Sequence, residues 1–314
     1  MQVDHSRNPA KGMTPEQVEV PNPKAHMMLN ALTIDVEDYY HVAGFESVIR
    51  FEDWDRFESR VERNTHRILD LLDDHHCKAT FFVLGWVGER FPKLVRDIHE
   101  RGHEIASHGY SHQRVYVQTP DQFRKETRQS KGILEDAIGR AIFGYRAASY
   151  SIITQSLWAL EILKEEGFAY DSSIFPVYHD RYGIPGYHRY CHVLSKEPGH
   201  GLIEFPLSTL RLAGFNVPIA GGGYFRLYPY RFIRWGIRRL NQEENQPGVI
   251  YLHPWEIDPQ QPRIRANALS RFRQYLNLGG TEGKLIRLLN DFRFGTMLDV
   301  LSHQGLVKAH RQAQ

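Results

Sequence analysis

The stretch Arg101–Val115, RGHEIASHGYSHQRV, decides how the chain is interpreted. Gly102 favours a turn, and residues 103–106 follow it as a short predicted strand. His108 and His112 come just after that strand, four residues apart. Barrel enzymes keep their chemistry at strand ends, so we expect the two imidazoles to face a site. Because the chain has 17 histidines in 314 residues, a chance surface pair is the alternative that the spacing alone leaves open.

An acidic cluster upstream supplies the oxygen ligands for such a site. The apolar run at residues 29–34, a predicted buried strand, leads directly into Asp35, Glu37 and Asp38. Burying three carboxylates in a core would cost more than the strand gains, so we expect them at a strand end facing a site. Imidazole and carboxylate ligands suit zinc and its first-row neighbours, and two histidines with one carboxylate leave coordination positions open. The pattern therefore predicts a catalytic metal site.

Strands and helices alternate along the chain. The predicted strands cover residues 29–34, 78–84, 103–106, 141–145, 168–170, 202–206 and 248–252. The predicted helices cover residues 55–73, 87–101, 119–138, 154–166 and 229–240, and the segment 264–301 is also predicted to be helical. Repeated strand–helix units indicate parallel strands joined by right-handed crossovers. We therefore expect a single α/β domain.

Composition limits the classes of protein that fit. The chain is 41% hydrophobic and 24% charged, which is ordinary for a globular protein, and its net charge of +2 implies no nucleic-acid partner. Two cysteines, Cys77 and Cys191, provide no disulfide framework and fit a reducing compartment. We find no apolar run long enough for a membrane span and no apolar core of a secretion signal at the N-terminus. The expected location is cytoplasmic.

The domain boundaries follow from polarity and from proline and glycine content. Residues 1–27 are polar and proline-rich and are predicted to be a flexible N-terminal tail. Residues 28–302 are expected to form one domain with a C-terminal helical extension, and residues 303–314 a polar tail. Residues 176–201 are predicted to be a long ordered loop. The stretch Gly221–Arg226, GGGYFR, is too loose to be a nucleotide-binding loop.

Four predicted strand ends deliver ionisable residues in sequence: the acidic cluster, the histidine pair, Arg146 and His253. Together, in this order, they resemble the polysaccharide deacetylases, a carbohydrate esterase family that includes chitin and peptidoglycan deacetylases. The resemblance covers roughly residues 29–256. The TIDVEDYY opening, the GGGYFR stretch and the YLHPWE segment resemble most the bacterial subgroup found with exopolysaccharide export and PEP-CTERM sorting systems.

The resemblance implies a distorted (β/α) barrel of fewer than eight strands, a single domain with extra C-terminal helices and a divalent metal at its mouth. The implied metal is zinc, with cobalt, nickel and manganese as alternatives. His108 and His112 match the family's metal-binding pair, although Gly109 stands where the family has a hydroxyl residue. The carboxylate ligand stays open between Glu37 and Asp38. Strand alternation aims Glu37 the same way as Asp35.

The resemblance also assigns catalytic roles. Asp35 matches the catalytic base, Arg146 the arginine that orients it and His253 the general acid. The backbone near Ser149 and Tyr150 matches part of the oxyanion site. The alternatives are a surface salt bridge for Arg146 and a strand-capping histidine at position 253. A carboxylate beside His253 would favour its charged form, and the two candidates for that carboxylate are Glu256 and Asp171.

The implied activity is metal-dependent hydrolysis of an N-acetyl group, a linear amide, on a glycan or glycan precursor, with release of acetate. We expect Tyr150, Tyr224 and Trp255 to contact this substrate. One alternative is an allantoinase-like hydrolase of cyclic amides on the same barrel, which should have a closed pocket rather than an open groove. Another is a catalytically silent glycan-binding protein. A non-haem iron oxygenase shares the ligand types, but its antiparallel barrel does not fit the strand–helix alternation. The oligomeric state is not predicted.

Overall fold

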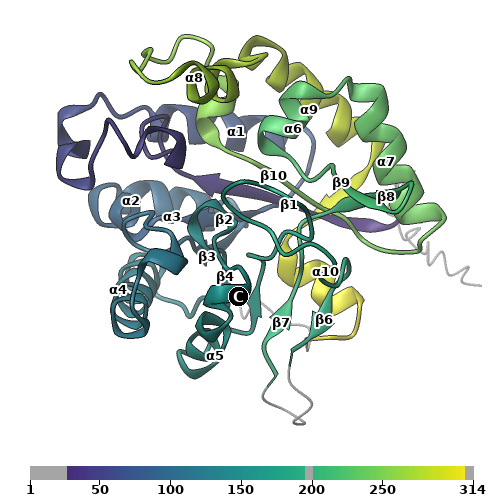
Figure 1. Ribbon diagram of the computed structural model, residues 1–314, viewed down its shortest axis with the longest axis horizontal. Helices are drawn as coiled ribbons and strands as arrows, with labels where there is room; N and C mark the ends of the chain where they lie inside the picture. Colours follow the sequence, from purple (N-terminus) through teal and green to yellow (C-terminus); the bar gives the residue numbers. More distant parts are fainter. Residues whose placement is uncertain (1–26, 195–200, 308–314) are drawn as a thin grey trace, which may run out of the picture.

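A computed structural model describes residues 27–194 and 201–307, and within them a curled sheet of nine strands forms the centre of one domain (Figure 1). The strands lie in the order β10-β1-β2-β3-β4-β5-β7-β6, and β11 pairs with β1 off this path. Neighbours from β10 to β7 are parallel, whereas β6 is antiparallel to β7. The predicted α/β class and distorted barrel are confirmed. The sheet has nine strands rather than the fewer than eight expected, because β6 and β11 add to the seven parallel strands from β10 to β7.

The parallel strands are short and buried, as expected for strands covered on both faces. They are β1 (Leu29–Val36), β2 (Thr80–Val83), β3 (Glu104–Ser107), β4 (Gly144–Tyr145), β5 (Tyr170–Asp171), β7 (Ile203–Glu204) and β10 (Val249–Leu252). The remaining strands are β6 (His192–Val193), β11 (Arg293–Gly295) and the hairpin β8 (Thr209–Leu212) and β9 (Phe215–Pro218). Because the parallel strands all end at one edge of the sheet, the side chains that follow them meet there.

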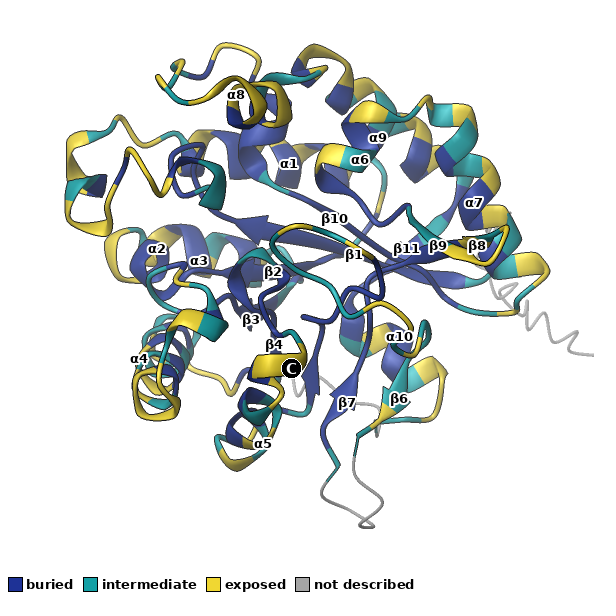
Figure 2. Cartoon of the chain, viewed as in Figure 1, coloured by how far each residue is buried: buried dark blue, intermediate teal, exposed yellow. Residues whose placement is uncertain are grey.

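Helices surround the sheet, with buried inner faces and exposed outer faces (Figure 2). They are α1 (Val61–Asp74), α2 (Gly85–Arg90), α3 (Pro92–Glu100), α4 (Pro120–Ile138), α5 (Trp158–Glu165), α6 (Gly222–Leu227), α7 (Tyr230–Gln242), α8 (Ala268–Tyr275), α9 (Leu278–Asp291) and α10 (Met297–His303). Among the described residues, no helix combines the length and apolar character that crossing a bilayer requires.

Several predicted boundaries were wrong. The first helix begins at Val61 rather than at residue 55, because residues 51–56 form a separate short 3-10 helix. The predicted helix 87–101 is two helices, since Pro92 cannot continue a helix that precedes it. The segment 264–301 contains strand β11 between helices, and the GGGYFR stretch begins helix α6.

The predicted boundaries of the domain and its tails are untested, although the sheet and helices above lie within residues 28–303. Most of the tail predicted for residues 1–27 lies outside the described residues, as do residues 308–314 of the C-terminal tail and residues 195–200 of the predicted long loop.

Candidate metal and acid–base site

Three side chains of types that can bind a metal meet at the C-terminal edge of the parallel strands. Glu37 follows β1, and His108 and His112 follow β3. One ligand atom from each lies within 4.8 Å of the others, and all three residues are buried. Glu37 Oε2 lies 2.8 Å from His112 Nε2 yet has no hydrogen-bond partner. A buried carboxylate oxygen that faces two imidazoles without aligned hydrogens fits a set of donors for one divalent cation.

Contacts of His108 prepare its ring for a metal. Its Nδ1 lies 2.8 Å from the Arg146 carbonyl oxygen, which fixes the proton on Nδ1 and leaves Nε2 as the ligand atom. Burial lowers the pKa of His108 to about 4, so the ring is neutral near pH 7. The next residue, Gly109, has φ of +75°, a conformation that strains other residues. This backbone turn favours glycine at position 109.

The structure places Asp38 outside the group formed by Glu37, His108 and His112. Its side chain accepts four hydrogen bonds elsewhere, from the Ser59 hydroxyl (2.9 Å) and the backbone N–H groups of Tyr39 (2.9 Å), Arg60 (2.6 Å) and Val61 (3.0 Å). Asp38 therefore fixes the start of α1 against the end of β1. Glu37 is the carboxylate that faces the two histidines.

Asp35 and Arg146 form a fully buried ion pair beside the cluster. Arg146 Nη1 lies 2.7 Å from Asp35 Oδ1, and the other N–H groups of Arg146 reach the Thr33 hydroxyl and the Ser172 carbonyl and hydroxyl. Burial raises the pKa of Asp35, but Arg146 and the nearby histidines outweigh it and bring the pKa below its usual value. Asp35 is therefore ionised and held in one orientation. Arg146 is not a surface residue, because its side chain is fully buried.

His253 follows β10 and faces the same cluster. Its Nε2 lies 3.2 Å from Glu37 Oε1 and 3.9 Å from Asp35 Oδ2. Its Nδ1 lies 2.6 Å from Glu256 Oε1, which makes Glu256 its carboxylate partner. Burial lowers the pKa of His253, but Glu37 and Glu256 outweigh burial and raise it to about 9. The other candidate partner, Asp171, instead accepts a hydrogen bond from the Ser173 hydroxyl (2.6 Å).

The predicted substrate-contacting residues all line a pocket of about 370 Å³ that contains the cluster. The Tyr150 hydroxyl donates to Asp35 Oδ2 at 3.2 Å, and Tyr224 forms part of the wall. Trp255 is almost fully buried, its ring stacks on His253 with centroids 5.0 Å apart, and its Nε1 lies 3.4 Å from Glu37 Oε1. Through these contacts Trp255 packs against His253 and donates to Glu37.

The predicted oxyanion site loses one of its donors. The backbone N–H of Tyr150 donates to the Ala147 carbonyl at 3.0 Å and so closes a turn. Ser149 and Tyr150 both have φ of 54°, in the left-handed region that residues with side chains rarely adopt. This turn directs the Tyr150 hydroxyl, rather than its backbone N–H, at the site.

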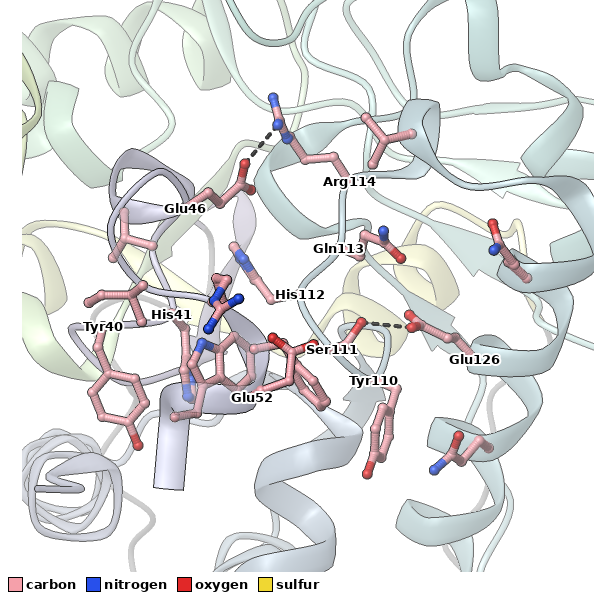
Figure 3. A pocket seen from close by; sticks show the side chains of 18 of the residues that line it. Tyr40, His41, Glu46, Glu52, Tyr110, Ser111, His112, Gln113, Arg114 and Glu126 are labelled. Carbon is pink, nitrogen blue, oxygen red and sulfur yellow. Dashed lines mark hydrogen bonds and ion pairs between the residues drawn. The ribbon is translucent and has the colours of Figure 1, made fainter. Parts of the chain in front are cut away.

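A second pocket of about 550 Å³ adjoins the first, and His112 and Val42 line both (Figure 3). Two polar contacts lie in its wall: Glu46 pairs with Arg114 at 2.7 Å, and the Ser111 hydroxyl donates to Glu126 at 2.7 Å. Sequence reasoning missed His41, which also lines this pocket. The signal was its place in the same DVEDYYH run as Asp35, at the end of the first strand.

Comparison with known proteins agrees with this geometry. Residues 46–170 match the family described as polysaccharide deacetylase. Over these residues the chain is similar to the polysaccharide deacetylases. Residues 172–302 match a domain of unknown function, DUF3473. The exopolysaccharide-associated subgroup stays a prediction.

Individual relatives share parts of this chain. A Bacillus cereus peptidoglycan-N-acetylglucosamine deacetylase is 38% identical over 98 residues, which are 31% of this chain and 36% of that protein. The chain thus spans about a third of that relative's length. A solved structure from Mycobacterium smegmatis, assigned as a polysaccharide deacetylase, superposes with a TM-score of 0.59 over 92% of this chain and 94% of that one at 21% identity. An allantoinase structure, Puue, superposes with a TM-score of 0.56 over 94% and 100% at 16% identity. These superpositions show the fold alone.

Proposed function

We propose that this chain is a metal-dependent hydrolase that removes N-acetyl groups from a glycan or glycan precursor and releases acetate. One observation carries the proposal: the Glu37–His108–His112 cluster lies against both a buried, arginine-held carboxylate and a histidine. The deacetylase names of the relatives support the reaction class.

We propose that Glu37, His108 and His112 hold the metal and that it is zinc, with cobalt, nickel or manganese able to replace it. Two imidazoles and one carboxylate are donors that suit all four ions. When bound, such an ion supplies Lewis-acid activation of water and of the acetyl carbonyl.

The chain's own residues then move the protons. Asp35, ionised and fixed by Arg146, accepts the proton that the attacking water loses. His253 carries a proton on Nε2 and donates it to the departing amine, because an amine cannot leave as an anion. Glu256 and Trp255 fix the His253 ring in this orientation. Tyr150 donates to the second oxygen of Asp35 and so limits its rotation.

The two adjoining pockets support a glycan rather than a small cyclic amide as substrate. Both are lined by His112, so a ligand longer than one sugar unit can lie across the cluster. Partly exposed aromatic residues, Tyr110 in one pocket and Tyr224 in the other, line the two pockets and offer faces for sugar rings. The cytoplasmic location and the link to exopolysaccharide synthesis stay predictions.

The test is acetate release by purified protein, stripped with a chelator and then reloaded with zinc. The expected result is release from N-acetylglucosamine oligomers that rises with oligomer length, is lost on stripping and returns with zinc. Hydrolysis of allantoin in place of the oligomers would favour the cyclic-amide alternative. Zinc binding without acetate release from any acetylated glycan would favour the silent glycan-binding alternative.

A further inference from the structure

Beyond the residues that face the pocket, Glu256 has a second partner. One oxygen, Oε1, contacts His253 through both the ring Nδ1 (2.6 Å) and the backbone N–H (3.1 Å). The other oxygen, Oε2, accepts a hydrogen bond from Arg226 Nε at 2.7 Å. Glu256 is fully buried and Arg226 nearly so. The carboxylate thus connects the arginine to the histidine.

The rest of the Arg226 guanidinium reaches the wall of the pocket. Nη1 donates to the carbonyl oxygens of Gln274 (2.8 Å) and Leu276 (3.0 Å), and Nη2 donates to that of Arg273 (2.9 Å). These carbonyls belong to the end of α8 and the segment before α9, and all three residues line the pocket that contains the metal cluster. The guanidinium also lies 5.1 Å from the ring of Trp255, which stacks on His253.

The GGGYFR stretch explains how Arg226 reaches this position. A Cβ on Gly221 would overlap the carbonyl oxygen of Tyr251 in β10, so only glycine lets α6 begin directly against that strand. Arg226 lies on α6, one turn from its start, and His253 follows the same strand. The glycines thereby bring the arginine and the histidine to opposite sides of Glu256.

We propose that Arg226 is a positioning residue that holds Glu256, and through it His253, while tying both to the pocket wall at residues 273–276. The inference rests on the proposed function, in which His253 donates a proton to the leaving amine. A planar guanidinium can serve the carboxylate and three carbonyls at once, whereas an ammonium group cannot. Without Arg226, the buried carboxylate of Glu256 loses one of its two cationic partners and one of its fixed contacts, and only His253 remains to offset its charge.

The test compares Arg226→Met with a matched control, Lys284→Met. Lys284 also stabilises α6, because its ammonium group donates to the carbonyl oxygens of Phe225, Arg226 and Tyr228. None of these three hydrogen bonds involves Glu256 or His253. Each zinc-loaded variant is assayed on an N-acetylglucosamine oligomer and on 4-nitrophenyl acetate, whose leaving group departs without a proton. Arg226→Met is made again in a His253→Ala background. Arg226→Lys is the second variant, because it keeps the buried charge if the methionine variant fails to fold.

We expect Arg226→Met to lower kcat on the oligomer about 10- to 100-fold, the usual cost of losing a group that orients a functional side chain, with KM nearly unchanged. The ester rate should fall far less. In the His253→Ala background, Arg226→Met should add almost nothing, because the two residues act in one chain. The kcat of Arg226→Lys on the oligomer should lie between those of wild type and Arg226→Met. Lys284→Met should lower the rates on both substrates slightly and by the same factor.

A nuclear magnetic resonance measurement separates this proposal from the proposed function. The hydrogen-bonded Nδ1 proton of His253, assigned by its absence in His253→Ala, should shift or vanish in Arg226→Met and stay in Lys284→Met. That result would support the positioning role even if wild type released no acetate, which would overturn the proposed function alone. An unchanged resonance, or equal losses on both substrates in Arg226→Met, would overturn the positioning role.

Discussion

The two halves of the chain contribute different parts of one site. Strands β1 to β5, with the segments that follow them, carry the Glu37–His108–His112 cluster, the Asp35–Arg146 pair and Tyr150. The half after residue 171 adds β7, β10 and β11 and carries His253 with the side chains that surround it. The first half contains the match to the deacetylase family, whereas the second matches a domain of unknown function.

The difference shows that the match to the uncharacterised domain does not mark an independent module. Strand β10 pairs with β1 over residues 31–34, so the second half closes the sheet next to the strand that precedes Asp35. His253 follows β10, and Asp35 lies near the end of the neighbouring parallel strand β1, so the two residues meet although they are far apart in sequence. The second half therefore contributes the histidine that lies beside Asp35 and Glu37.

The largest effect should come from the metal ligands of the first half. His108→Ala or His112→Ala should remove most of the bound metal and lower acetate release more than about 100-fold. This loss exceeds the usual one of about 10- to 100-fold for a group that only orients a metal ligand. Glu37→Ala should behave the same way. Elemental analysis of the purified variants measures the metal. Asp38→Asn is the matched control and should keep the metal while losing thermal stability, since its hydrogen bonds fix the start of α1. Full occupancy in both histidine variants would contradict the site.

The next prediction concerns the base alone, whose replacement should affect the rate and not the metal. Asp35→Asn should keep the metal and lower kcat by about 10²- to 10⁴-fold, the usual range for losing general acid–base catalysis. Arg146→Ala should lower the rate less, because it frees the carboxylate rather than deleting it, and should cost more stability, because it leaves Asp35 buried without its partner. The measurement is the rate of acetate release per metal-loaded molecule for Asp35→Asn and for Arg146→Ala. A near-normal rate in Asp35→Asn would mean that another residue is the base.

The smallest effect tests the boundary between the halves, where Asp171 of β5 lies beside Glu204 of β7 in the sheet register. Both are fully buried, and burial raises the pKa of Asp171 to about 6 and that of Glu204 above its usual value. Acids with raised pKa values stabilise the fold while protonated, so stability should fall as pH rises from about 4 through 6 and above. The shift of Asp171 from 3.8 to about 6 corresponds to at most about 3 kcal/mol.

Glu204→Gln should reduce the loss of stability at high pH, because the glutamine amide cannot ionise. Melting temperatures between about pH 4 and pH 8 give the measurement, with the exposed Glu243→Gln as the control. A wild-type melting temperature that rises across this range, or a Glu204→Gln profile parallel to wild type, would contradict the raised pKa values of the pair.

Much of the site could be predicted from the sequence because its residues follow strands. Asp35, His108 and His253 each come at or just after a short apolar run, and parallel strands bring such positions to one edge. Period-two alternation also favoured Glu37 over Asp38, as the structure has it.

The rest depends on contacts between distant loops. Nothing local shows that the Tyr150 N–H closes a turn or that Trp255 packs behind His253. Arg226 was quoted within GGGYFR but could not be connected to Glu256, because the connection depends on how closely α6 approaches β10. The β8–β9 hairpin was missed because its turn, Ala213-Gly214, is not one of the strong hairpin signals.

One measurement tests most directly whether the second half supplies the proton to a site built by the first. Zinc-loaded His253→Ala is compared with wild type on an N-acetylglucosamine oligomer and on 4-nitrophenyl acetate. We predict full metal content, a loss of about 10²- to 10⁴-fold in both kcat and kcat/KM on the oligomer, and a much smaller loss on the ester. An equal fractional loss on both substrates would mean that His253 only positions or packs, and it would contradict the division of roles between the two halves.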